Sequence, residues 1–300
     1  MPSWFIEYLL LSAVWGTSFL FMHVAVLDFG VLPTAALRVG VAALTLLPWV
    51  LWQRQLPLLR QHWRLITLAG MLNPALPFIC YAYALQFLST GLASILNATT
   101  PLFGAIIAWL WLRQRLTASR VLGLFVGFVG VVALAWDSLG LGSDNAAQQA
   151  LAVMVCLCAP FLYGLGACYT QRYLKQVPSL VLASGSLLAS SVVLAVPAYL
   201  FWPDRVAGHD AWLAVICVGV LCTGFAYILF FRLLAHIGPA KTLTVTFLIP
   251  VFAIVAGAIF LAEQLTSHML LCGLVIVLGT ALSTGLLSVG WLERRAASRK

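Results

Sequence analysis

Charged residues are scarce in this chain. They make up 8% of its 300 residues, and 63% of the residues are hydrophobic, whereas roughly a quarter of a typical soluble domain is charged. Such a composition cannot supply a water-facing surface, so lipid must cover most of the outside. The apolar stretches run for about 20 residues, the length of a membrane-spanning helix and not of a barrel strand. The composition therefore predicts an all-α membrane protein.

Carboxylates are also lacking in the middle of every apolar stretch, because Glu7 and Glu263 both lie near stretch ends. An intramembrane enzyme needs paired acids, a nucleophile with its base, or metal ligands. The histidines do not form such a set, since they are scattered at His23, His62, His209, His236 and His268. We therefore expect no catalytic residues, no metal and no cofactor. A basic segment before the first apolar stretch is lacking too, so we expect this stretch to be retained as a span and not cleaved as a signal peptide.

Hydropathy and charge together predict ten spans. They lie near residues 4–27, 33–52, 64–86, 90–112, 118–136, 149–171, 178–202, 211–234, 240–262 and 269–290. Basic residues collect in alternate connections, and acidic residues such as Asp28 and Asp204 collect in the others. Because basic residues mark the cytoplasmic side of a membrane protein, both termini are predicted to be cytoplasmic. The net charge of +8 thus reflects topology, and a nucleic-acid partner is not indicated.

The two halves of the chain resemble each other at an offset of 149 residues. The matches include Gly70 with Gly219, Pro101 with Pro250, Leu116-Thr117 with Leu265-Thr266, and Gly130 with Gly279. Each half has five predicted spans, an odd number, so the second half must cross the membrane in the opposite orientation. We predict two inverted five-helix repeats, at 1–140 and 148–292, followed by a basic cytoplasmic tail at 293–300. Transporters commonly use inverted repeats to expose one central site to either side in turn.

Polar and aromatic residues within the spans indicate where such a site lies. Pro101 and Pro250 cannot donate to the carbonyls of Asn97 and Thr246, which predicts a helix break with a gating role in each half. A freed carbonyl is costly in lipid, so we expect these turns to face protein or a water-filled cavity, although a kink needed only for packing is the alternative. Ordinary core packing is likewise the alternative for the aromatic members. The other predicted cavity-lining residues are Trp15, His23, Asn73, Tyr81, Ser94, Tyr163, Thr223 and Tyr227.

Arg38 is the basic residue placed inside a span, where a charge costs about 2.5–3.5 kcal/mol on insertion scales. Two roles are open for it. It either reaches the membrane surface and pairs with Asp28, or it provides the counter-charge for a substrate carboxylate. Separately, Gly123 and Gly127 form a G-x-x-x-G pattern, which predicts close helix packing, either inside the chain or at the face of a homodimer.

The residues singled out above resemble a known family. Trp15-Gly16-Thr17-Ser18, Arg38, and the runs Ser94–Pro101 and Thr242–Pro250 with their following Leu-Thr pairs are similar to EamA-type transporters of the drug/metabolite transporter superfamily. The resemblance covers nearly the whole chain. It implies ten helices in two inverted repeats around a central cavity, a bacterial inner-membrane location, and export of amino acids or other metabolites. Gln114 departs from the pattern, because the second half has Glu263 at the equivalent place.

The sequence thus favours a secondary transporter of a small polar or zwitterionic metabolite, with the substrate and the lipid bilayer as its partners. The scarcity of buried carboxylates disfavours acid-based proton coupling and leaves facilitated transport or coupling through His23. An intramembrane enzyme and a receptor-like membrane protein are the alternatives. Neither alternative explains the duplicated helix breaks.

Overall fold

The computed structural model describes residues 3–114, 116–138, 146–243 and 245–287. Within these ranges the chain is helical apart from short connections, and it contains no strand. Nine helical segments of the described chain are long and apolar enough to cross a membrane, and Val245–Phe260 is a shorter apolar helix. The predicted all-α membrane fold of ten helices is therefore confirmed. The tail at 293–300 and the linker residues 139–145 lie outside the described residues.

The first repeat begins with two uninterrupted spans and continues with two composite ones. Its elements are α1 (Ser3–Phe29), α2 (Val31–Trp52), α3 (Leu56–Gln61), α4 (Trp63–Gly70), η1 (Met71–Ala75), α5 (Leu76–Ala84), α6 (Thr90–Asn97), α7 (Thr100–Trp111) and α8 (Ala118–Ser138). The third span consists of α4, η1 and α5, and the fourth consists of α6 and α7.

The second repeat follows the same order. Its elements are α9 (Ala146–Tyr173), α10 (Ser179–Leu200), α11 (His209–Ile216), η2 (Cys217–Phe225), α12 (Ala226–Leu243), α13 (Val245–Phe260) and α14 (Ser267–Thr284). The eighth span consists of α11, η2 and α12 and continues as helix to Leu243, beyond the predicted end near residue 234. The ninth span, α13, is correspondingly shorter than predicted.

The repeat is visible in backbone details as well as in helix order. Arg113 and Ala262 are 149 residues apart, and both have positive φ, at 53° and 52°. The next amide in each repeat bonds back six residues, from Gln114 to Ala108 at 3.2 Å and from Glu263 to Gly257 at 3.1 Å. The two turns are therefore built alike, although a positive φ is unusual for residues with a Cβ atom.

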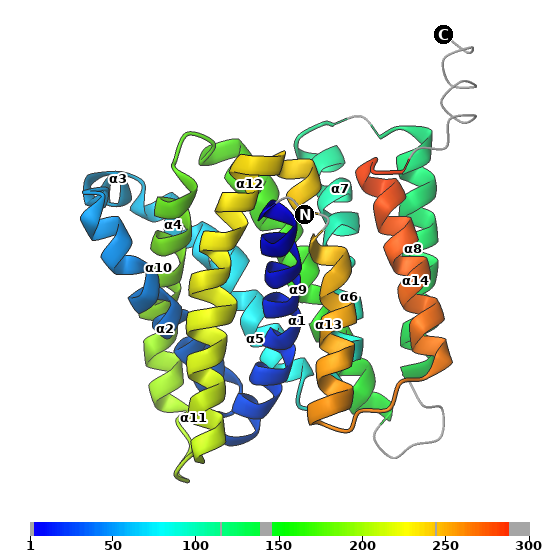
Figure 1. The fold of residues 1–300 in the computed structure, drawn as a ribbon, viewed down its shortest axis with the longest axis horizontal. Coiled ribbons are helices and arrows are strands. Elements are labelled where there is room, and N and C mark those ends of the chain that lie inside the picture. The colour runs from blue at the N-terminus through cyan, green and yellow to red at the C-terminus, as the bar shows by residue number, and fades with distance from the viewer. Residues whose placement is uncertain (1–2, 115, 139–145, 244, 288–300) are drawn as a thin grey trace.

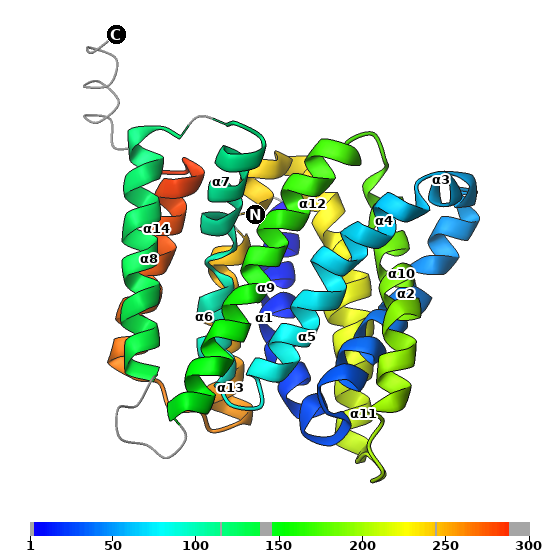
Figure 2. The same ribbon diagram turned by 180° about the vertical axis from the view of Figure 1, so that it is seen from behind.

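The two repeats are interleaved. Figures 1 and 2 show α8 beside α14 at one edge of the molecule, α2 beside α10 toward the other, and α1 and α9 near the middle. The first helix α1 packs mainly against α11, α12, η2 and α13 of the second repeat, and α9 packs mainly against α5, α6 and α7 of the first. Glycines allow these contacts, since a Cβ at Gly16 would lie 2.8 Å from the Ile249 carbonyl and one at Gly164 would lie 2.8 Å from the Gly104 amide.

Gly123 and Gly127 lie inside the protein. A Cβ at Gly123 would lie 2.7 Å from the carbonyl of Gly279, and Gly127 packs on Leu102 and Gly279. The G-x-x-x-G pattern therefore serves the close approach of α8 to α14 within the chain. It gives no support to the homodimer alternative.

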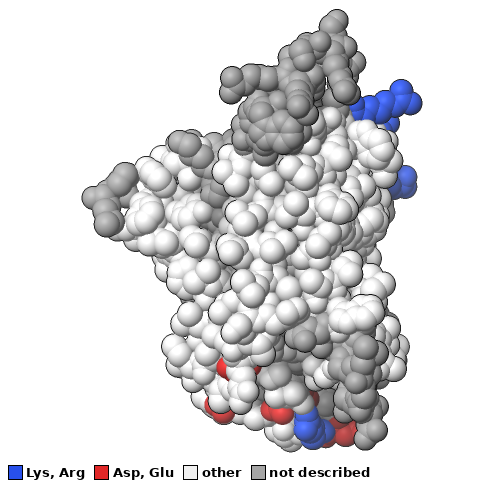
Figure 3. All heavy atoms as spheres, turned by 90° about the vertical axis from the view of Figure 1, so that its right-hand side faces the viewer, with Lys and Arg blue, Asp and Glu red and all other residues white. Residues whose placement is uncertain are grey.

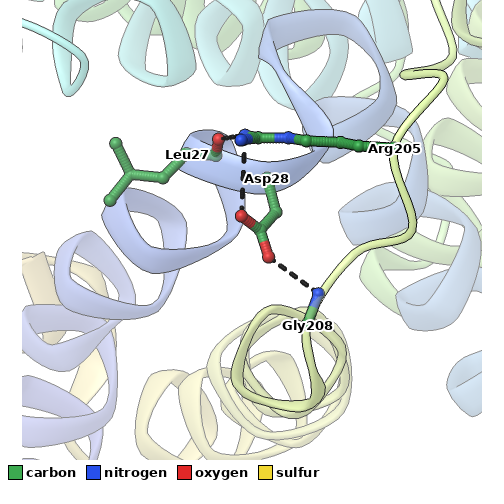
Figure 4. A network of polar contacts seen from close by, with 4 residues as sticks. All are labelled: Leu27, Asp28, Arg205 and Gly208. Carbon is green, nitrogen blue, oxygen red and sulfur yellow. Dashed lines mark hydrogen bonds and ion pairs between the residues drawn. The ribbon is translucent and has the colours of Figure 1, made fainter.

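Charge separates the two ends of the molecule. Figure 3 shows acidic side chains gathered at the lower end of one face and basic side chains toward the upper end, with a basic side chain among the acidic ones. At the end of α1, Asp28 lies 3.5 Å from Arg205 and accepts the Gly208 amide at 2.8 Å, while Arg205 also donates to the Leu27 carbonyl (Figure 4). Near the start of α1, Glu7 pairs with Arg232 at 2.6 Å. Both ends of α1 are thus tied to the second repeat.

Candidate functional site

Two π-helical segments occupy equivalent places in the third and eighth spans. These segments are η1 and η2, and residues 71–75 correspond to 220–224 at the repeat offset. In η1, Pro74 cannot donate to the Gly70 carbonyl. The hydroxyl of Ser190 from α10 lies 3.0 Å from that carbonyl and 2.7 Å from the Ser186 carbonyl of its own helix, and its one proton serves these two acceptors. In η2, Thr223 donates its hydroxyl to the Val218 carbonyl at 2.8 Å. Such bulges widen a helix locally and occur frequently at functional sites.

Arg38 of α2 lies between these segments. It is 6% exposed, and its Nε donates to the hydroxyl of Thr223 at 3.2 Å. Its Nη1 lies 2.6 Å from the sulfur of Met22 on α1, and the guanidinium sits 3.7 Å above the ring centre of Phe78 on α5. The interpretation of Arg38 as a snorkelling residue paired with Asp28 is therefore wrong. Asp28 pairs instead with Arg205 of the α10–α11 connection, and the Arg38 side chain is buried inside the protein.

Tyr81 and Asn97 form the second polar element of the site. The Tyr81 hydroxyl donates to the side-chain oxygen of Asn97 at 2.7 Å, which joins α5 to the end of α6. The ring of Tyr81 lies 5.4 Å from that of Phe19 and 6.3 Å from that of Tyr163. Both aromatic residues predicted from the third and sixth spans are therefore brought together with Asn97.

Two further phenols lie beside the buried cation. Tyr163 and Tyr227 pack against the buried residues of α2 and α5 that include Val39 and Phe78, and Tyr227 stacks on Phe231 at 6.0 Å and 13°. We call the residues Met22, Arg38, Phe78, Tyr81, Asn97, Tyr163, Thr223 and Tyr227 the Arg38 cluster. It draws on both repeats, which is the placement expected for a central substrate site in an inverted-repeat protein.

The fourth span breaks at the predicted place. It is interrupted between Asn97 and Thr100, with Pro101 at the start of α7. The hydroxyls of Thr99 and Thr100 donate to the carbonyls of Leu96 and Asn97 at 2.6 and 2.7 Å. Short hydroxyl side chains of this kind compete with the backbone bonds of a helix.

The predicted break at Pro250 is absent, because α13 continues through it from Val245 to Phe260. The physical reason lies beside the proline. The residues equivalent to Thr99 and Thr100 are Leu248 and Ile249, which have no hydroxyl to satisfy a freed carbonyl. The two prolines therefore have different structural effects.

The other predicted site residues have partners outside the Arg38 cluster or lie elsewhere on their helices. Trp15 packs 5.6 Å from Phe230, at the α1–α12 contact. His23 Nδ1 lies 2.8 Å from the Leu85 carbonyl. Asn73 donates to the Ala69 carbonyl at 3.0 Å, buried Ser94 donates to the Gly91 carbonyl at 2.7 Å, and Thr246 is half-buried on α13. Among the described side chains, Arg38 forms no hydrogen bond with any of these residues.

Sequence reasoning missed two kinds of residue. Phe78 has no polar group to mark it, although it is the repeat equivalent of the predicted residue Tyr227, and tertiary packing places it on Arg38. Glu263 is marked in the sequence only by its place near the end of an apolar stretch, yet its carboxylate accepts the Thr90 amide at 2.7 Å, the Thr90 hydroxyl at 2.9 Å and the Gly91 amide at 3.3 Å. It therefore caps α6, a helix of the other repeat.

Two surface hollows lie away from the Arg38 cluster. One has a volume of about 370 Å³ and is lined by Phe29, Trp202, Trp212 and the loop around Arg205. The other, of about 420 Å³, is an apolar groove along α8 between Phe125 and Trp136. Residues of the Arg38 cluster line neither hollow.

A ten-helix inverted repeat with paired π-helical spans around a buried polar cluster is the architecture of a membrane transporter. The chain belongs to the EamA-like transporter family, whose model matches residues 3–136 and 150–285. It is similar to the uncharacterized transporter YvbV of Bacillus subtilis, with 28% identity over 73% of this chain and 70% of that protein. It is also similar to the uncharacterized transporter YoaV of the same organism, with 25% identity over 91% of this chain and 94% of that protein.

Two further similarities extend this result. The WAT1-related chloroplastic protein At3g02690 of Arabidopsis thaliana is 24% identical over 84% of this chain and 62% of its own length. A solved crystal structure shares the fold with a TM-score of 0.66 at 20% identity, covering 95% of this chain and 98% of the other. The protein is therefore a multi-pass membrane transporter of this family.

Proposed function

We propose that this protein is a secondary transporter, acting as an exporter or facilitator, of small polar metabolites such as amino acids. The observation that carries the proposal is the convergence of both π-helical spans on one buried polar cluster. The third span contributes Phe78 and Tyr81, and η2 contributes Thr223. A transporter site needs such weakened helices, because backbone and side-chain groups must exchange partners when the site opens to the other side.

The Arg38 cluster supplies the contacts that a small metabolite requires. The guanidinium donates hydrogen bonds, and the Asn97 amide donates and accepts them. The aromatic faces of Tyr81 and Tyr163 attract apolar groups and cations. The Tyr81–Asn97 hydrogen bond joins α5 to the end of α6 within the cluster and so holds these two polar side chains in place.

We further propose that the repeats are 1–140 and 148–292 and that the protein lies in the bacterial inner membrane with both termini cytoplasmic. The separation of basic and acidic side chains in Figure 3 supports this orientation. The start of α1 and the end of α14 lie at the same, upper end of the molecule in Figure 1, as an even number of spans requires.

Uptake of labelled metabolites into proteoliposomes tests the proposal. Purified full-length protein is reconstituted, and a panel of amino acids and related metabolites is supplied with and without a pH gradient. We expect saturable uptake of one class, reduced in the Asn97→Leu variant. Stimulation by the gradient would assign proton coupling, and indifference to it would assign facilitated transport. Failure of the whole panel with protein shown to be folded would contradict the proposal and favour a receptor or an enzyme.

A further inference from the structure

The charge of Arg38 has no acidic partner in the described part of the chain. The five acidic side chains that the structure describes are all engaged or placed elsewhere. Glu7 pairs with Arg232 and Asp28 with Arg205, and Glu263 caps α6. The remaining two, Asp204 and Asp210, are exposed in or beside the α10–α11 connection.

The groups that do contact Arg38 are neutral. They are the Thr223 hydroxyl, the Met22 thioether and the Phe78 ring. Such neighbours orient a guanidinium without cancelling its charge. A buried cation is usually paired, because leaving a single charge unpaired in a low-dielectric interior is unfavourable. Among the side chains that the structure describes, none compensates the positive charge of Arg38 in the candidate transport site.

The geometry leaves a specific edge of the guanidinium for a partner. Phe78 covers one face of the guanidinium plane at 3.7 Å, and Nε is committed to Thr223. No hydrogen bond from Nη2 to a described residue is present. The terminal N–H groups lie in the guanidinium plane, where they match the two oxygens of a carboxylate and bind it with paired hydrogen bonds.

We propose that Arg38 binds the carboxylate of the transported substrate and that this substrate carries a single carboxylate, with no requirement for an ammonium group. This rests on the proposed transport function and assigns its substrate class. One cation is neutralised by one anion, so a dianion would leave the site with excess negative charge. The described residues of the cluster include no acid to pair with an ammonium group. A substrate ammonium group would find only aromatic faces there and would be repelled by the charge of Arg38. Monocarboxylates are therefore expected to bind at least as well as the corresponding amino acids.

Binding to the full-length protein in detergent, measured by calorimetry, tests this substrate class separately from transport. The probes are two matched series that differ only in charged groups. The first is 3-phenylpropionate, phenylalanine and 2-phenylethylamine, and the second is pentanoate, norvaline and butylamine. We expect each carboxylate to bind at least as tightly as its amino acid and at least about tenfold more tightly than its amine, the factor that 1.4 kcal/mol represents. Equal binding of the amines, or binding of no probe by folded protein, would overturn the proposal.

Two variants connect this selectivity to Arg38. Arg38→Gln removes the charge, and we expect it to abolish the preference for carboxylates over amines. Met22→Glu keeps Arg38 but supplies an internal carboxylate next to Nη1, so it should also abolish carboxylate binding. Met22→Gln changes the same side chain without adding charge and gives the reference for that loss. The Met22 pair keeps the test decisive if Arg38→Gln does not fold. Unchanged carboxylate preference in folded Arg38→Gln, or in Met22→Glu, would overturn the proposal.

Uptake of the same probes into proteoliposomes distinguishes the two proposals. Carboxylate-selective binding without uptake of any tested metabolite would contradict the transport function and leave the anion site in place. Saturable uptake without carboxylate selectivity would confirm transport and overturn the assignment of Arg38.

Discussion

Thr90 donates both its amide and its hydroxyl to the carboxylate of Glu263, which lies 173 residues later in the chain. The α6 helix has its own N-cap, Ser89, and the other repeat thereby supplies acceptors for the amides of Thr90 and Gly91 as well. The equivalent position of Thr90 in the second repeat is Pro239, which has no N–H to donate. This explains why Gln114, the counterpart of Glu263, is exposed and not acidic. The equivalent interaction thus lacks both of its groups: Gln114 has no carboxylate, and Pro239 has no amide N–H.

Glu263→Ala is expected to lower the free energy of unfolding by about 1.5–3 kcal/mol, the range for hydrogen bonds to a charged group. Thermal melting in detergent measures the effect. Gln264→Ala removes an exposed neighbour and should melt like the unmodified protein. Equal melting of both variants would show that the cap does not contribute to stability.

Tyr81→Phe and Asn97→Leu each remove one partner of the Tyr81–Asn97 hydrogen bond. We expect Tyr81→Phe to reduce transport by about two- to tenfold, since a net hydrogen bond is worth roughly 0.5–1.5 kcal/mol. Asn97→Leu should reduce transport further, because it also leaves the Tyr81 hydroxyl buried without an acceptor. Membrane insertion should remain intact. Tyr83→Phe is the matched control, because Tyr83 packs on Phe87 outside the Arg38 cluster. Full transport by Asn97→Leu would remove Asn97 from the site.

Gly279→Ala should destabilise the α8–α14 contact strongly. A Cβ at Gly279 would lie 2.8 Å from the Gly123 carbonyl, so the two backbones must separate. Overpacking of this kind typically costs about 1–3 kcal/mol. Gly104→Ala is the control, because a Cβ there would meet its nearest neighbour, Gly164, at an ordinary 3.9 Å. Thermal melting in detergent measures both variants. We expect Gly279→Ala to melt at a clearly lower temperature than Gly104→Ala, and equal melting would contradict the prediction.

Ser190→Ala tests the repair of the helix at Pro74. The substitution leaves the Gly70 carbonyl without the Ser190 hydroxyl, and a buried unsatisfied acceptor costs about 1–3 kcal/mol. Ser12→Ala is the comparison, because the buried Ser12 hydroxyl bonds within its own helix to the Tyr8 carbonyl. We expect Ser190→Ala to melt at a clearly lower temperature than Ser12→Ala. Similar melting would mean that Gly70 finds another donor.

The sequence alone could predict the helices, the repeat and part of the site, and the reasons are physical. Span length and charge placement follow from the membrane, and the repeat offset aligned the turns at Arg113 and Ala262. Helical periodicity assigns a residue to a face but does not identify its neighbour on another helix. Met22 and Phe78 therefore could not be predicted as contacts of Arg38.

The choice of partner for Asp28 could not be predicted either. Proximity along the chain favoured Arg38, ten residues away, but the α10–α11 connection brings Arg205 to Asp28 from 177 residues later. Likewise, equal repeat positions suggested equal breaks at Pro101 and Pro250. The hydroxyls of Thr99 and Thr100, absent from the second repeat, decided the difference.

The exchange of α1 and α9 between the repeats has a consequence for assembly. During synthesis, α1 is completed long before α11, α12 and α13. It therefore enters the membrane before most of the helices that it packs against have been made. A chain divided between α8 and α9 would yield two fragments, each holding a helix whose packing partners are on the other. We therefore expect neither fragment to fold by itself, and both to accumulate only when they are made together.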